Sequence, residues 1–91
     1  MHETGLVRGL IRQIEQVAAQ NAARVSGARI SGVRVWLGAL SHFSAAHFGE
    51  HFAIEARGGI AEGARLVIIE SDDPTDPDAQ HLRLESLDME V

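Results

Sequence analysis

The apolar positions in the first quarter of the chain repeat with helical spacing. They fall at intervals of three and four residues, at Leu6, Leu10, Ile14, Val17 and Ala18. Such spacing places the side chains on one face of an α-helix. Thr4 is a suitable N-cap, and Ser26 with Gly27 would break the helix. We therefore predict an amphipathic helix from about Thr4 to Ala22 or Arg24.

The next segment changes to a two-residue period. Val33, Val35 and Leu37 alternate with Arg34 and Trp36. Because successive side chains of a strand point to opposite faces, this alternation predicts a β-strand with one buried face.

The stretch SHFSAAHFGEHFAIEARGG returns to a helical pattern. Ser44 can cap the start of the helix, and the Gly58-Gly59 pair can end it. Its apolar stripe consists of Phe48, Phe52 and Ala56, with Phe43 nearby. We therefore predict a second helix that buries its phenylalanines.

Two more strands complete the pattern. Ala64–Glu70 is almost continuously apolar, so we expect it to be covered on both faces. In His81–Val91 the apolar side chains change phase, and a bulge near Ser86 would reconcile them. Gly32 can mark a similar bulge in the first strand. The last two strands could pair as an antiparallel hairpin across a loop of about ten residues.

These elements follow the order α-β-α-β-β. A chain of 91 residues is the size of one domain, so residues 1–91 form a single unit. The predicted fold class is α+β, with two helices packed on a three-stranded β-sheet. The unpaired edges of so small a sheet favour a homodimer or docking of a partner.

Composition narrows the function classes. The formal net charge of −5 argues against nucleic acid or an anionic membrane as a partner. No apolar run approaches the ~20 residues needed to span a membrane, and no signal peptide is visible, so the cytoplasm is the expected compartment. The chain has no cysteine, which excludes disulfides, thiolate zinc sites and cysteine nucleophiles.

Both prolines lie in the acidic segment SDDPTDPDAQ, residues 71–80. Its four aspartates resemble a calcium loop in composition. The segment lacks the central glycine and final glutamate of that motif. We interpret it as a solvated acidic linker without helix or strand.

The first three residues, Met1, His2 and Glu3, offer a set of nitrogen ligands. The α-amino group of Met1 has a pKa near ~8, so a metal can displace its proton at neutral pH. The imidazole of His2 closes a chelate ring with backbone nitrogen, and Glu3 adds an amide. A planar nitrogen set favours Ni(II) or Cu(II). Alternatively, a histidine at this position is simply solvated.

A second group of metal-ligating residues lies in the second predicted helix. His47 and His51 are four residues apart, so they share one face, with Glu50 beside them and His42 shortly before. Two imidazoles and a carboxylate can hold zinc or nickel. The other interpretation is a solvent-facing histidine pair. No Ser/His/Asp set or phosphate loop is present, so we do not expect an enzyme.

Several motifs together resemble one family. MHE, GALS, AEGARL and ESLDMEV, in this order over nearly the whole chain, make it similar to the HypA/HybF family of hydrogenase nickel-incorporation proteins. The resemblance implies a nickel metallochaperone that binds Ni(II) at Met1, His2 and Glu3. It also implies a HypB-type GTPase and the large subunit of [NiFe]-hydrogenase as partners, with urease as a further recipient of nickel.

The chain departs from this family in one place. Family members carry a zinc domain with two CxxC pairs between the last two strands, where this chain has only residues 71–80. No structural zinc is therefore expected. A metal-independent interaction module, built from Trp36, the exposed helix faces and the sheet edges, is the alternative function.

Overall fold

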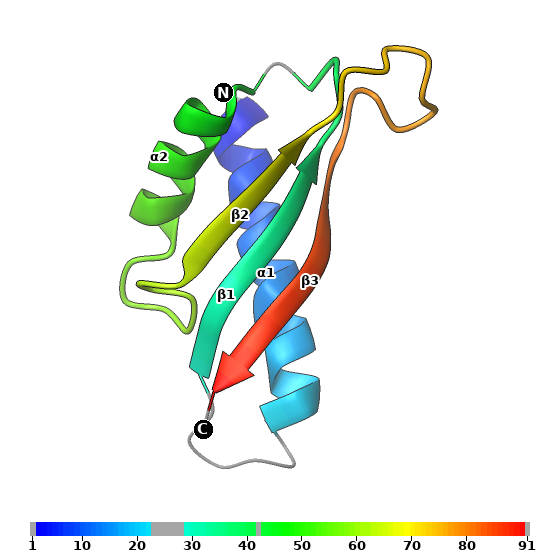
Figure 1. Ribbon diagram of the computed structural model, residues 1–91. Coiled ribbons are helices and arrows are strands. Elements are labelled where there is room, and N and C mark those ends of the chain that lie inside the picture. Colours follow the sequence, from blue (N-terminus) through cyan, green and yellow to red (C-terminus); the bar gives the residue numbers. More distant parts are fainter. Residues whose placement is uncertain (1, 23–28, 42, 91) are drawn as a thin grey trace.

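The structure, a computed structural model, describes residues 2–22, 29–41 and 43–90. Its elements are α1 (His2–Ala22), β1 (Arg29–Leu37), α2 (Ala45–Glu55), β2 (Arg65–Glu70) and β3 (Leu82–Glu90). The predicted order α-β-α-β-β is confirmed. Figure 1 shows the three strands as one sheet with both helices behind it.

The sheet is mixed, with β1 at its centre. β2 pairs with β1 in parallel, and β3 pairs with the other edge of β1 in the antiparallel direction. The expected hairpin between β2 and β3 is therefore wrong. Because α2 carries the chain back across the sheet, β2 can lie parallel to β1, and β3 then takes the remaining edge.

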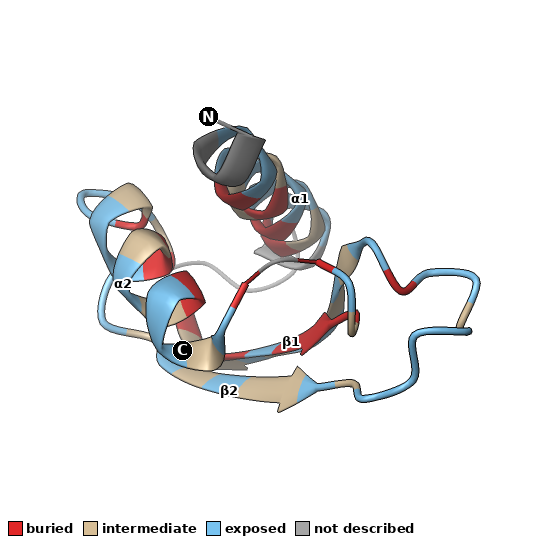
Figure 2. Cartoon of the chain, turned by 90° about the horizontal axis from the view of Figure 1, so that it is seen from above, coloured by how far each residue is buried: buried red, intermediate tan, exposed pale blue. Residues whose placement is uncertain are grey.

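Both helices cover the same face of the sheet (Figure 2). A single core cluster joins them to it through the inward side chains of α1, β1 and α2, among them Val7, Ile14, Val35, Leu37 and Phe48. The expectation that β2 is covered on both faces is wrong, since the outward Val67 remains 42% exposed. Its apolar run reflects strand propensity, because neither of the two described helices packs on the second face.

Both predicted bulges are confirmed. In the pairing of β1 with β3, the register shifts between Ile30 and Gly32, and again between Arg34 and Val35. The second shift leaves Glu85, the neighbour of Ser86, without an opposing residue. Because of this extra residue, Leu84 and Leu87 both pack against the core although they are three residues apart, as the sequence pattern required.

Helix α1 starts earlier than predicted. It includes His2, so Thr4 lies inside the helix and is not its cap. Its last residue, Ala22, agrees with the prediction, whereas Arg24, Ser26 and Gly27 lie outside the described residues.

Helix α2 begins as predicted. The hydroxyl of Ser44 accepts a hydrogen bond from the His47 amide at 3.1 Å. The helix ends at Glu55 with Ala56 as C-cap, and Gly58 follows with a positive φ of 75°. The hydrogen bond from the His47 amide to Ser44 therefore sets the start of α2.

The acidic segment 71–80 contains turns but no helix or strand, as predicted. It lies against the exit of β1: the Gly38 amide donates to the His81 carbonyl at 2.9 Å, and the Leu40 amide donates to the Ala79 carbonyl at 2.7 Å. Ala79 is only 3% exposed. The segment is thus attached to the sheet by backbone hydrogen bonds and one buried methyl group, although most of its side chains are solvated.

Candidate metal centre

The predicted N-terminal site lies at the start of α1. The structure describes the backbone of His2 and Glu3 as helical but not their side chains, and Met1 lies outside the described residues. The first four amides of an α-helix have no acceptor within the helix. The amide nitrogens of His2 and Glu3 therefore donate no hydrogen bond of the helix ladder that a metal would have to replace.

A planar chelate through consecutive amides also demands a change of backbone shape. It needs ψ near 0° at the chelating residues, whereas an α-helix has ψ near about −42°. The first turn of α1 must therefore unwind when such a complex forms. Helix ends open at little cost in free energy, so this requirement is compatible with the site.

The structure brings His47 and His51 together on α2. Their rings stack with centroids 4.7 Å apart and planes 17° from parallel. Phe48 and Phe52 are 0% and 4% exposed, so they point into the core and leave both histidines at the rim, as predicted. The ring of Phe43 lies 6.0 Å from that of His47.

Glu50 is solvent-exposed on the same helix. Within the part of the chain that the structure describes, no three histidine or carboxylate side chains are grouped closely enough to hold a metal ion. His42 is outside the described residues. A site on α2 would accordingly depend on the two stacked imidazoles, and its existence stays a prediction.

One interaction that the sequence did not indicate orients the two helices. Arg8 of α1 donates to Glu55 of α2 at 2.8 Å, and the Glu55 side chain is 20% exposed. The partners are 47 positions apart, so no local pattern could reveal the pair. It ties the end of α2 to the second turn of α1.

Trp36, the aromatic residue of the surface proposed for docking, is largely covered. Trp36 is only 9% exposed, with the Arg83 guanidinium 4.1 Å from its ring centroid. Arg83 itself donates to Glu85 at 2.9 Å and to Asp78 at 3.1 Å. The hydrogen bond to Glu85 is the main cause that raises the pKa of Arg83 above its ordinary value.

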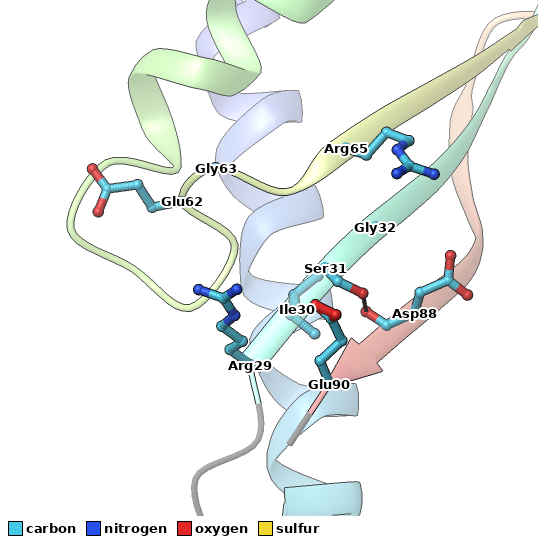
Figure 3. A pocket seen from close by; sticks show the side chains of 9 residues that line it. All are labelled: Arg29, Ile30, Ser31, Gly32, Glu62, Gly63, Arg65, Asp88 and Glu90. Atoms are coloured by element: carbon cyan, nitrogen blue, oxygen red, sulfur yellow. Dashed lines mark hydrogen bonds between the residues drawn. The ribbon is translucent and has the colours of Figure 1, made fainter.

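A hollow of about 440 Å³ opens at the amino ends of β1 and β2 (Figure 3). Charges of both signs surround it, from Arg29, Glu62, Arg65, Asp88 and Glu90. The two arginine side chains point away from one another in Figure 3. The hollow therefore has no point that is surrounded by side chains of one charge. No local sequence pattern indicates this hollow, because its lining comes from three separate segments of the chain.

A search for membrane spans found none: neither helix in the described residues combines the length and the apolar character that a bilayer crossing requires.

Comparison with known proteins identifies a family whose model matches this chain. A family model described as hydrogenase/urease nickel incorporation, metallochaperone, hypA matches residues 1–74. The fold is similar to the solution structure of the Ni metallochaperone HypA from Helicobacter pylori, with a TM-score of 0.75 and 21% identity over 96% of each chain. It also resembles a structure titled as the solution structure of HypA protein, with a TM-score of 0.70 and 24% identity over 98% of this chain and 96% of that one. No curated protein sequence matches significantly.

Proposed function

This chain belongs to the HypA family of hydrogenase and urease nickel-incorporation metallochaperones, and from that premise we propose that it binds Ni(II) at Met1, His2 and Glu3 and delivers the ion to a maturing nickel enzyme. The observation that carries the proposal is the family match, which begins at residue 1 and so covers the three residues proposed as ligands. The recipient that we propose is the large subunit of [NiFe]-hydrogenase or another nickel enzyme. A HypB-type GTPase is the proposed partner, and the cytoplasm the proposed compartment.

The donor set supports nickel as the cargo. One amine, backbone amides and one imidazole are all nitrogen ligands, and they can lie in one plane around the ion. Such a complex leaves the two axial faces open. A ligand of the recipient can therefore attack the ion before the first nitrogen leaves, and transfer proceeds by ligand exchange.

The position of these ligands at a helix start supports release as well as binding. Only the first turn of α1 has to open. The buried side chains of this helix start at Val7, which is 0% exposed. Loading and unloading the ion should therefore leave the hydrophobic core intact.

We further propose that segment 71–80 stands where other family members carry their zinc domain. The family match ends at residue 74, inside this segment. The chain has no cysteine to supply thiolates, so nickel is the only metal that we assign to the protein.

The direct test is a nickel titration of protein that starts at Met1 without a tag. We expect a weak visible band typical of planar Ni(II), and we expect His2→Ala to abolish it. His81→Ala is the matched control, because His81 is exposed in a loop far along the sequence and should leave the band unchanged. An unchanged band in His2→Ala would reject the site.

One extra residue before Met1 tests the alternative of a metal-independent module. A nickel carrier should lose the band and its delivery function, because its amine has moved away from His2. A docking module should keep its function. The scattered exposed side chains Leu6, Leu40, Ile54 and Val67 do not favour the docking alternative.

A further inference from the structure

The histidine pair on α2 continues a stripe that begins at Glu55, on the side of that helix that meets α1. Glu55 defines this side, because it binds Arg8 of α1 at 2.8 Å. Counting back four residues at a time from Glu55 leads to His51 and then to His47, and each step rotates by only about 40°. The three side chains therefore form one stripe along α2 that turns gradually from α1 toward solvent.

The direction of the helices places this stripe beside the start of α1. Both helices begin at the end of the molecule where β1 finishes, and both run antiparallel to β1 (Figure 1). Each step from Glu55 to His51 to His47 therefore moves about 6 Å toward that end. One such step along α1 from Arg8 reaches Thr4, in the first turn of that helix, which begins at His2.

We propose that His47 and His51 form a second Ni(II) site, which holds the ion beside the N-terminal ligands before they close around it. The inference rests on the proposed function, since it assigns an entry point for the same cargo. The stacked rings have centroids 4.7 Å apart, and a turn of each toward the other would place one nitrogen of each on a shared ion.

The required movement is small. Metal–nitrogen bonds are about 2.0–2.1 Å long, so two nitrogens on one ion lie about 3–4 Å apart. The χ2 angle of histidine is broad, and His47 is exposed while His51 is half-buried. Rotation of the two rings therefore brings their nitrogens into this range without moving the helix backbone.

The surrounding structure keeps the pair in place. Ser44 caps α2 by accepting from the His47 amide, and Phe48 and Phe52, each about 100° round the helix from the histidine before it, anchor α2 in the core. Glu50 lies about 140° round the helix from Glu55, on the side away from α1. The proposed site therefore uses two imidazoles, with water completing the coordination of the ion.

Two features separate this site from the N-terminal one. Planar Ni(II) in the N-terminal chelate is diamagnetic. Ni(II) on two imidazoles and several waters is octahedral and paramagnetic. Proton NMR signals of the His47 and His51 rings should therefore broaden when Ni(II) fills this site. This readout does not depend on any activity of the carrier.

The experiment titrates Ni(II) into the His2→Ala variant, in which the N-terminal site is absent, and follows calorimetry and ring-proton signals. We expect one remaining equivalent to bind and to broaden the signals of both rings. Adding His47→Ala or His51→Ala should weaken this binding by about tenfold or more. Alanine suits a helix, and circular dichroism checks that each variant is folded.

The matched controls are Glu50→Gln on the same helix and His81→Ala in the loop, each in the His2→Ala background. Both should bind within about twofold of that background. Residual binding that survives loss of both α2 histidines, or no binding at all in His2→Ala, would overturn the proposal. Loss of the planar band in His2→Ala reports on the N-terminal site separately, so failure of one site is distinguishable from failure of the other.

Discussion

The backbone of the acidic segment 71–80 packs closely against Gly38, the residue that follows β1. A Cβ atom at this position would lie 2.6 Å from the Ala79 carbonyl carbon and 2.7 Å from the Asp78 oxygen, and nearer still to the Ala79 oxygen. The Gly38 amide also donates to the carbonyl of His81. A side chain here would therefore push against backbone atoms that cannot rotate away.

We predict that Gly38→Ala lowers the free energy of unfolding by about 1–3 kcal/mol, the usual cost of overpacking. In a domain of this size each kcal/mol lowers the melting temperature by roughly 4–8 °C, which calorimetry can measure. Gly9→Ala is the control. A Cβ there meets nothing within 4 Å, and alanine within α1 should stabilise the protein by about 0.5–1 kcal/mol. Equal stability of Gly38→Ala and wild type would contradict the close contact.

At the scale of the element, segment 71–80 is organised by its own aspartates. The carboxylate of Asp73 accepts from the Thr75 hydroxyl at 2.6 Å and from the Thr75 amide at 2.9 Å. Asp76 accepts from the Asp78 amide at 2.8 Å. The segment that the sequence indicated only as a linker is therefore a chain of local turns.

The hydrogen bond from the Thr75 hydroxyl, and then the one from its amide, hold the pKa of Asp73 below its ordinary value of 3.8. The stabilisation from these bonds is fully present above pH 3.8 and is lost as the pH falls through the lower folded-state pKa. We predict that Thr75→Val shifts the pKa of Asp73 upward, as measured by NMR titration of its carboxyl carbon. Thr75→Ser keeps the hydroxyl and should keep the depressed pKa. Identical pKa values in the two variants would refute this account.

At the scale of the whole molecule, one core connects every element. Ile14 of α1, Val35 of β1 and Phe48 of α2 are each 0% exposed and belong to the same cluster. The outer edges of β2 and β3 pair with no further strand among the described residues, so the homodimer stays a prediction. With a single cluster, the helices and the sheet should unfold together.

We predict that Ile14→Ala lowers the free energy of unfolding by about 2–5 kcal/mol, because it leaves a cavity between α1 and the sheet. Circular dichroism follows the helices, and fluorescence of Trp36, the one tryptophan of the chain, follows the sheet. Both midpoints should fall by the same amount. Gln13→Ala, at an exposed position of the same helix, should leave them nearly unchanged. Separate transitions for the two probes would show that α1 is not part of a common core.

Local patterns determined much of this fold. The cap at Ser44, the bulges near Gly32 and Ser86 and most of the helical stripe ending at Ala18 were predicted, because each depends on neighbours within a few residues. At the start of the stripe the prediction was wrong, since Val7 is buried and Leu6 is exposed. The N-terminal ligand set was also predicted, from local donor chemistry and from the family resemblance, and it stays a prediction. That chemistry depends on adjacent groups along the chain and not on the arrangement of the helices.

Tertiary structure decided what depends on residues far apart in the sequence. It set the parallel pairing of β1 with β2, left the second face of β2 without a covering helix, and joined Arg8 to Glu55. The same packing buried Phe48 and Phe52 and left His47 and His51 at the rim of α2. A hydrophobic period specifies which face of an element is buried, but only the packing of all five elements specifies which element lies against it.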